Sequence, residues 1–201
     1  MIFHNLECNK IEFKEIYNIN YTMLHIVTGC MFAGKTSELV KIYNSKNAIV
    51  IDYDTESLVE NTNNFDIPKI KQGHLYTHDL ESIPCIKLLN IQTLIDYMHY
   101  TIKLEEDIIL INEAQFFTGL KEFVKCALEN KKTVYVFGLD GDFKQKKFGE
   151  ILDLIPISDT YTKLYANCEC GAKASFSKRL STFIGQYAPD DKYKPVCRNC
   201  L

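Results

Sequence analysis

The sequence contains no tryptophan, only two arginines among its 23 basic residues, and no long run of apolar residues. No run approaches the ~18 residues that a membrane-spanning helix requires, so we expect no membrane partner. With 26 acidic residues the net charge is −3, and the pI is near 6.0. This balance disfavours the broad basic surface that binds a nucleic-acid backbone, and we expect no nucleic acid as a partner.

The first residues, MIFHNLECNKIEFKE, also lack the apolar segment of a secretory signal peptide. Eight cysteines in a chain that begins this way are more typical of reduced thiols than of a disulfide framework. We therefore expect a cytoplasmic protein in which clustered cysteines bind metal.

Composition and hydrophobic patterning predict an α/β fold. Hydrophobic residues make up 46% of the 201 positions and charged residues 24%, which is typical of a globular chain. Short apolar runs alternate with segments of helical spacing. We expect strands at 24–28, 48–51, 84–89, 108–111 and 133–137, and helices at 34–45, 91–104 and 118–129. Strands that are apolar on both faces predict a parallel sheet flanked by helices.

The same pattern divides the chain into segments. Residues 1–23 carry no clear pattern and are interpreted as an N-terminal extension, and the polar stretch 54–82 is interpreted as long loops. Beyond about residue 160 the sequence changes to short strands with paired cysteines. We therefore predict an α/β domain over 24–160 and a small C-terminal domain over 161–201.

A phosphate-binding loop is the clearest motif. Gly29–Thr36, GCMFAGKT, matches G-x4-G-K-[ST] and lies between an apolar strand and a helical segment. In such a loop, backbone N–H groups and the helix N-terminus face phosphate oxygens. The lysine, here Lys35, reaches the β- and γ-phosphates, and the hydroxyl of Thr36 coordinates Mg²⁺. The alternative is a chance match in a glycine turn, which the flanking strand and helix disfavour.

A second polar group follows the apolar run 108–111. P-loop proteins hold Mg²⁺ through an acid at the end of a neighbouring strand, and this strand ends in Asn112 and Glu113. Ligands bind at the carboxyl ends of strands in such folds. A carboxylate at Glu113 can accept the proton of a hydroxyl that attacks the γ-phosphate. The alternative is a solvated glutamate at a strand end.

Four cysteines gather in the last part of the chain. Cys197 and Cys200 have zinc-knuckle spacing, and Cys168 and Cys170 form a tighter C-x-C pair with Gly171 beside it. Four thiolates in two close pairs make a closed tetrahedral site, which indicates a structural zinc. The alternative is four reduced thiols without a metal.

Taken together and in order, these motifs resemble the cellular and poxvirus-type thymidine kinases over about residues 24–200. The resemblance is carried by Gly29–Thr36, Asn112–Phe117, Leu139–Phe143, Lys144–Ile151, Thr77–Asp79, Lys178–Leu180, Asp191–Tyr193 and Val196–Arg198. It implies a P-loop NTPase-like domain with a small C-terminal zinc-binding lasso domain.

The resemblance also implies an activity. Members of that family transfer the γ-phosphate of ATP, with Mg²⁺, to the 5′-hydroxyl of thymidine, and also accept deoxyuridine, in nucleotide salvage for DNA synthesis. They are usually homotetramers with one structural Zn²⁺ per chain, and feedback by dTTP is a family trait.

Residue by residue, the resemblance implies three sets of contacts. Glu113 is the catalytic base, Lys35 binds phosphate, and Arg179 is a candidate to stabilise charge on the γ-phosphoryl group. The ATP-binding residues are Gly29, Cys30, Met31, Phe32, Ala33, Gly34, Lys35, Thr36, Asn112 and Gln115. The thymidine-binding residues are Met31, Phe116, Leu139 and Phe143, with Phe143 stacked on the base, and, from a lasso over about residues 180–195, Ile184, Gly185, Gln186, Tyr187, Ala188 and Tyr193.

Four positions depart from the family pattern. Asn112 stands where the family has Asp, and Glu56 where it has an Arg that helps the phosphates, so we expect a penalty in rate. The lasso segment Gly185–Pro189 lacks the family's Gly-Gly pair, and Cys168–Cys170 replaces C-x2-C. Two alternatives to an active kinase follow. One is a degenerate P-loop protein that binds nucleotide or thymidine with little turnover. The other is a P-loop protein that grips nucleic acid through its zinc knuckle, which the net charge, the few arginines and the missing tryptophan disfavour.

Overall fold

A computed structural model describes residues 22–54, 71–77, 80–88, 91, 106–186 and 191–201. Several sequence-based predictions lie outside these residues. They include most of the extension 1–23, Glu56, the His78–Asp79 part of the Thr77–Asp79 motif, nearly all of the helix expected at 91–104, and Tyr187 and Ala188 of the lasso.

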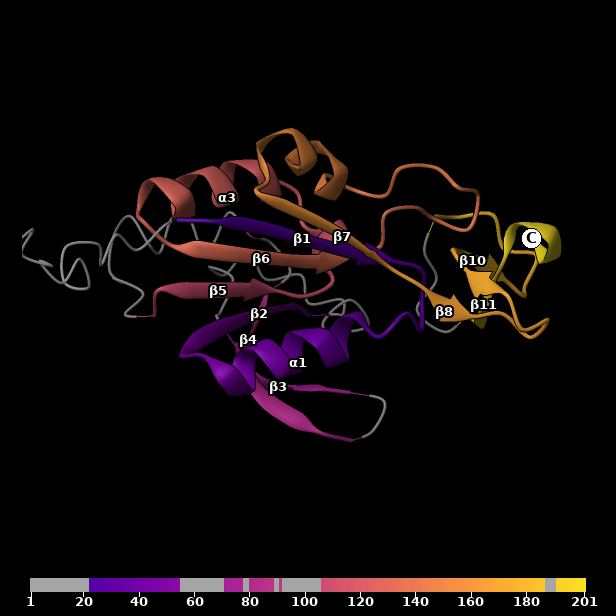
Figure 1. The fold of residues 1–201 in the computed structure, drawn as a ribbon, viewed down its shortest axis with the longest axis horizontal. Coiled ribbons are helices and arrows are strands. Elements are labelled where there is room, and N and C mark those ends of the chain that lie inside the picture. Colours follow the sequence, from indigo (N-terminus) through magenta and orange to yellow (C-terminus); the bar gives the residue numbers. More distant parts are fainter. Residues whose placement is uncertain (1–21, 55–70, 78–79, 89–90, 92–105, 187–190) are drawn as a thin grey trace, which may run out of the picture.

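The core of the fold is a seven-stranded sheet with the order β3-β4-β2-β5-β6-β1-β7 (Figure 1). Every neighbouring pair is parallel except β3 and β4. The strands are β1 Leu24–Gly29, β2 Ala48–Tyr53, β3 Lys71–Tyr76, β4 Ser82–Leu88, β5 Ile108–Ile111, β6 Thr133–Gly138 and β7 Thr160–Leu164. The predicted α/β class and the apolar strands are therefore confirmed.

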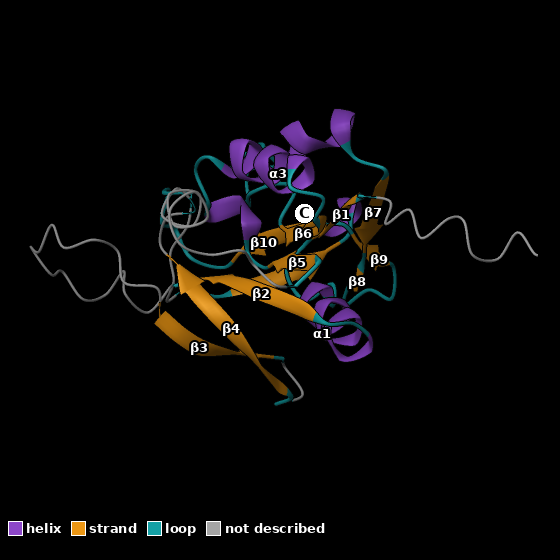
Figure 2. Ribbon diagram, turned by 90° about the vertical axis from the view of Figure 1, so that its left-hand side faces the viewer, coloured by secondary structure: helices purple, strands orange, loops and turns teal. Residues whose placement is uncertain are grey.

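Helices cover both faces of this sheet because the central strands are apolar on both sides. On β5, Ile109 and Ile111 face the cluster that contains α3 (Leu120–Glu129) and the 3-10 helix η3 (Ile151–Ile157). Leu110, between them, faces the cluster that contains α1 (Lys35–Ser45). Figure 2 shows α3 and α1 on opposite sides of the strands.

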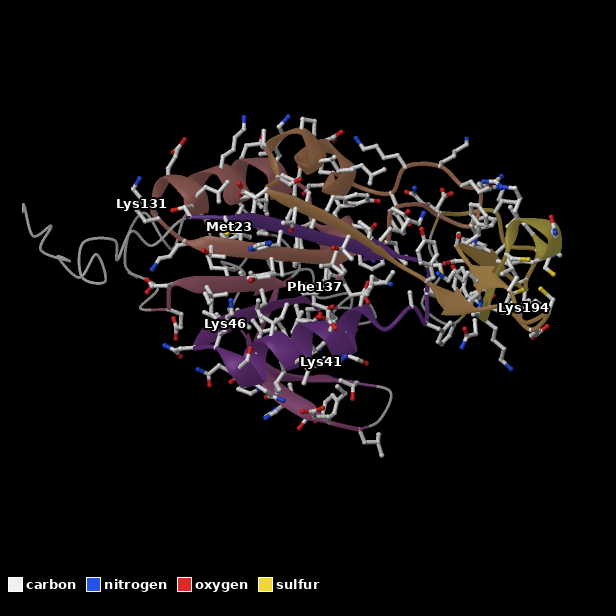
Figure 3. The ribbon with its side chains drawn as sticks, viewed as in Figure 1. Met23, Lys41, Lys46, Lys131, Phe137 and Lys194 are labelled. Atoms are coloured by element: carbon white, nitrogen blue, oxygen red, sulfur yellow. The ribbon has the colours of Figure 1, made fainter. Side chains whose placement is uncertain are left out.

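Side-chain directions follow the same division. Phe137 on β6 is fully buried and lies within the interior in Figure 3, whereas Lys41 and Lys46 lie on the outside near α1. The carboxyl edge of the sheet carries the residues that follow β1, β5 and β6.

The hairpin β3–β4 corrects one prediction. The stretch 54–82 was expected to form long loops, yet Lys71–Tyr76 forms β3, antiparallel to β4. Its sequence KQGHLY is polar and contains a glycine, so it lacks the apolar signal of the parallel strands. The pairing with β4, which is a tertiary contact, stabilises it at the sheet edge.

The C-terminal part is built from two small antiparallel ladders. Strand β8 (Ala166–Asn167) pairs with β9 (Lys173–Ala174), and β10 (Phe176–Arg179) pairs with β11 (Tyr193–Val196). They lie beyond one end of the main sheet, near Lys194 and the C-terminus (Figures 1 and 3). Strand β7 pairs with β1 and carries the main sheet to Leu164, past the predicted boundary between residues 160 and 161.

Among the described residues, no helix combines the length and apolar character needed to cross a membrane.

The packing of α3 leads to a stability prediction. Phe123 is fully buried between α3 and the sheet, so Phe123→Ala should lower the free energy of unfolding by about 3–5 kcal/mol through lost burial and a residual cavity. Urea unfolding followed by circular dichroism measures this. Lys125→Ala, on the exposed face of the same helix, is the matched control and should change stability by less than about 0.5 kcal/mol. Equal effects of the two variants would contradict this packing.

Candidate active site

The phosphate loop connects β1 directly to α1. Gly34 has φ 82 and ψ 18 and immediately precedes Lys35, the first residue of the helix, so the loop ends in a left-handed conformation that favours glycine. Phe32 also has positive φ, 64°, which is strained for a bulky residue and is typical of ligand-binding segments. The N-terminus of α1 therefore faces the loop, as a phosphate cradle requires.

Lys35 lies inside this loop. Its Nζ donates hydrogen bonds to the carbonyl oxygens of Gly29 at 3.2 Å and Cys30 at 2.9 Å. Burial lowers the pKa of Lys35 below its ordinary value, and the carboxylate of Glu113 opposes that shift. The fold thus brings the two predicted catalytic groups from β1–α1 and from the end of β5 into electrostatic contact.

Glu113 is held in place by Gln115. Glu113 has φ 49 and ψ 38 and begins the 3-10 helix η2 (Ala114–Phe116). Gln115 Nε2 donates to Glu113 Oε2 at 2.6 Å, while its Oε1 accepts from the backbone N–H of Leu139 at 2.9 Å. Both donor and acceptor of the Gln115 amide are therefore used to tie Glu113 to the loop that follows β6.

The backbone of Gly149 lies so close to the backbone of Gln115 that position 149 cannot carry a side chain. Gly149 has φ 62, and a Cβ atom built on it would lie 2.1 Å from the Gln115 carbonyl oxygen. Only glycine accommodates this close approach. The resemblance assigned Gln115 to ATP. The structure adds its contacts with Glu113 and Leu139, and the local sequence does not signal the contact with Leu139, which lies 24 residues away.

One cavity of about 380 Å³ collects the predicted residues. Its size is within the range usual for small-molecule sites. The predicted nucleotide residues Met31, Thr36, Asn112, Glu113 and Gln115 line it together with the predicted thymidine residues Phe116 and Leu139; the rest of the lining is Asp52, Tyr53, His74, Leu75, Tyr76, Thr77 and Lys87. The phosphate loop and the predicted base pocket therefore open into the same space.

The ring of Phe116 lies at one wall of the cavity. It stacks on Tyr53 at a centroid distance of 4.9 Å and meets the edge of Phe148 at 5.3 Å. The neighbouring Phe117 is fully buried in the core. Of the two adjacent phenylalanines, one is thus available to a ligand and the other stabilises the fold.

Arg179 organises the segment predicted to be the lasso. The side chain is buried, and its guanidinium forms an ion pair with Asp191 at 3.0 Å. It also donates hydrogen bonds to the carbonyl oxygens of Phe183, Gly185 and Gln186 and to the hydroxyl of Tyr193. These contacts lie within the lasso, and they account for the burial of a charged side chain.

The lasso also contacts the loop after β6. Phe143 lies 3.9 Å from the Arg179 guanidinium, measured to the ring centroid. Gln186 Nε2 donates to Asp142 at 3.2 Å, and Lys144 Nζ donates to the Ile184 carbonyl oxygen at 2.7 Å. The predicted residues Phe143, Ile184, Gly185, Gln186 and Tyr193 are therefore brought together, whereas Tyr187 and Ala188 lie outside the described residues.

The four C-terminal cysteines form one cluster. The sulfur atoms of Cys168, Cys170, Cys197 and Cys200 all lie within 4.8 Å of one another, and those of Cys170 and Cys197 are 3.6 Å apart. Tetrahedral zinc with Zn–S bonds of about 2.3 Å places sulfur atoms about 3.8 Å apart. Backbone N–H groups of Cys170 and Cys197 lower the pKa of the Cys168 thiol to about 6. The cluster can therefore hold a metal ion, and its geometry and donor set fit zinc.

The cysteine cluster packs directly against the phosphate loop. Cys30 is buried in the same apolar cluster as Cys168 and Cys197, and its thiol donates to the Ala174 carbonyl oxygen at 3.4 Å. The N–H of Met31 donates to Ser177 Oγ at 2.9 Å. The loop is therefore buttressed by the C-terminal part, a contact that the sequence motifs did not predict.

Comparison with known proteins agrees with this arrangement. The family model described as "Thymidine kinase" matches residues 22–201. The chain belongs to the thymidine kinase family. It is 37% identical to "Thymidine kinase" of Oryza sativa subsp. japonica over 87% of this chain, and it spans 64% of the rice protein's length. It is 35% identical to "Thymidine kinase a" of Arabidopsis thaliana, covering 87% of this chain and 73% of that protein. "Thymidine kinase" of Fowlpox virus (strain NVSL) is 35% identical, covering 89% of this chain and 96% of that protein.

Asn112, which stands where the thymidine kinase family has Asp, lines the cavity. Asn112 is buried, and its Nδ2 donates to Asp52 Oδ1 at 2.8 Å. Asp52 was not among the predicted site residues. Glu56, which stands where the family has an Arg, lies outside the described residues.

The cysteine cluster yields a metal-binding prediction. Purified protein should contain about one zinc per chain, and Cys197→Ser should lose most of it because three thiolates bind zinc more weakly than four. Mass spectrometry of the metals measures this. Cys126→Ser, a cysteine on α3 outside the cluster, should keep its zinc. Wild-type zinc content in Cys197→Ser would contradict the assignment.

Proposed function

We propose that this protein transfers the γ-phosphate of ATP to the 5′-hydroxyl of thymidine, and also of deoxyuridine, as a step of nucleotide salvage. The observation that supports this most directly is the shared cavity. Glu113 lines it beside Thr36 of the phosphate loop and beside Met31, Phe116 and Leu139. A base, a phosphate cradle and an apolar pocket for a flat ring thus meet in one space.

The residues of the chain act mainly by positioning and electrostatics. The amides of the loop and Lys35 bind the phosphates. Glu113 accepts the proton of the 5′-hydroxyl, and the hydrogen bond from Gln115 keeps its carboxylate aimed at the cavity. Phe116 and Leu139 exclude water from the nucleoside. Stacking of Phe143 on the base stays a prediction, since its ring packs against the Arg179 guanidinium and does not line this cavity.

Mg²⁺ bound with ATP would offset the negative charge of the phosphates. The cavity fits such an ion because oxygen ligands, which Mg²⁺ prefers, come from Thr36 and Asn112. The zinc that the cysteine cluster fits has a structural role in this proposal, since four thiolates leave no open position for substrate.

The lasso has a second role in the proposal. The contacts of Arg179 with lasso carbonyl oxygens and with Tyr193 support a function in shaping the segment that covers the nucleoside. Charge stabilisation by Arg179 on the γ-phosphoryl group stays a prediction. A homotetramer, feedback by dTTP and a cytoplasmic location also stay predictions.

A deoxynucleoside panel tests the proposed function. Zinc-loaded protein with Mg·ATP should phosphorylate thymidine and deoxyuridine and leave deoxyadenosine and deoxyguanosine unchanged, as measured by chromatography of the monophosphates. Glu113→Gln is the matched variant. It should bind ATP normally yet lose at least about 10²-fold in single-turnover rate, because the amide cannot accept the proton.

Two results would contradict the proposal. Absence of monophosphate with every nucleoside, while ATP binds, would indicate a binding protein without turnover. A wild-type rate in Glu113→Gln would remove Glu113 from the role of base.

Gln115 yields a prediction that separates positioning from binding. Gln115→Met, which keeps the length of the side chain, removes both hydrogen bonds and should lower kcat about 10–100-fold with little change in the KM for thymidine. Steady-state kinetics with Lys125→Ala as the control measures this. A change confined to KM would show that Gln115 contacts substrate instead of orienting Glu113.

A further inference from the structure

The end of β5 lacks the carboxylate that is expected in the proposed metal site. P-loop proteins complement the Ser or Thr of the loop with a carboxylate at a neighbouring strand end, and its charge helps to hold the metal. Asn112 occupies that position here. An amide offers an oxygen ligand but no charge, so another group must supply the charge if Mg·ATP is bound at ordinary affinity.

Asp52 lies next to Asn112 on the adjacent strand. Strands β2 and β5 are parallel with Ile51 opposite Ile111, and the backbone N–H of Asn112 donates to the Ile51 carbonyl oxygen at 2.8 Å. The next residues, Asp52 and Asn112, are therefore side by side at the carboxyl edge of the sheet. Their side chains are joined by the 2.8 Å hydrogen bond from Asn112 Nδ2 to Asp52 Oδ1.

Both carboxylate oxygens of Asp52 have defined partners. Oδ1 accepts from Asn112, and Oδ2 forms an ion pair at 3.1 Å with Lys87, which pairs with Asp52 in the register of β2 and β4. One N–H of the Asn112 amide donates to Asp52. The amide oxygen Oδ1 is the atom of this side chain that can bind a metal ion, and it is not used in that hydrogen bond. Asp52, Lys87 and Asn112 all line the same cavity as Thr36 and Glu113.

The location of Asp52 favours a functional charge over a purely structural one. The aspartate is 4% exposed, and a buried ion pair contributes little net stability compared with apolar residues of similar size. A charged group retained at such a cost, at the edge where ligands bind and within the nucleotide cavity, is typical of a functional site.

We propose that Asp52 supplies the carboxylate charge of the Mg·nucleotide site that Asn112 does not, so that the acid has moved from the end of β5 to the end of β2. The inference rests on the proposed function. Asn112 transmits the arrangement by bonding Asp52 with its N–H and presenting its carbonyl oxygen. Lys87 holds the carboxylate in place.

The strand pair allows an isosteric test. Asp52→Asn keeps a side chain of the same shape that can still bond Asn112, yet removes the charge. The double variant Asp52→Asn/Asn112→Asp retains the hydrogen bond and returns the charge to the end of β5. Asp107→Asn is the matched control, because Asp107 precedes β5 at the opposite edge of the sheet and its side chain is 74% exposed.

The measurement is the affinity of the full-chain protein·ADP complex for Mn²⁺, followed by the loss of the free Mn²⁺ signal in electron paramagnetic resonance. Mn²⁺ stands in for Mg²⁺ because both prefer carboxylate and water oxygens. Asp52→Asn should weaken Mn²⁺ binding about tenfold or more while metal-free ADP binding stays close to wild type. The melting temperature should fall in this variant because Lys87 loses its ion-pair partner, so the affinities are compared at a temperature at which both proteins are folded. The double variant should recover most of the affinity, and Asp107→Asn should match wild type.

Two results would overturn the inference and leave the proposed function intact. One is wild-type Mn²⁺ affinity in Asp52→Asn. The other is failure of the folded double variant to recover affinity, which would mean that Asp52 acts only through its bonds to Lys87 and Asn112. Failure of the wild-type protein to bind Mn²⁺·ADP at all would instead contradict the proposed function itself.

Discussion

The parallel register of β2, β5, β6 and β1 is the constraint on which the site depends. Parallel strands all present their carboxyl ends at the same edge, so the residues that follow them converge without any direct attraction between them. Met31 and Thr36 of the phosphate loop reach one cavity in this way, together with Asp52, Glu113 and Leu139. The buried Ile, Val and Leu side chains that hold the register therefore determine the distances within the site as much as they determine stability.

The C-terminal part is held together by contacts other than a large apolar core. It is too short to build a core of its own, and its described strands have two to four residues. The four clustered cysteines would supply cross-links through a shared metal ion where apolar area is scarce. Because Cys30 and Met31 of the phosphate loop contact this part, its order and the shape of the loop are coupled. Arg179 performs a comparable task for the lasso by gathering carbonyl oxygens around one guanidinium.

Residues that act through local patterns could be predicted, and residues that act through distant contacts could not. The phosphate loop, the apolar strands and the four cysteines each depend on spacing within a short segment, and the family membership agrees with them. Strand β3 was missed because its stability comes from pairing with β4, which the polar sequence KQGHLY does not signal. The bond between Gln115 and Leu139 spans 24 residues and the bond between Asn112 and Asp52 spans 60, so no local sequence pattern signals either contact.

The sequence by itself determined the fold class, the phosphate loop, the base at Glu113 as a hypothesis and the cysteine cluster. These follow from local backbone chemistry and from the alternation of apolar runs. Only the tertiary structure decided that Gln115 joins Glu113 to Leu139, that Arg179 bonds the lasso from the end of β10, and that Asp52 pairs with Asn112. The physical reason is that hydrogen bonds and ion pairs between neighbouring strands depend on sheet order and register. Sheet order is set by the packing of the whole core, and no single segment encodes it.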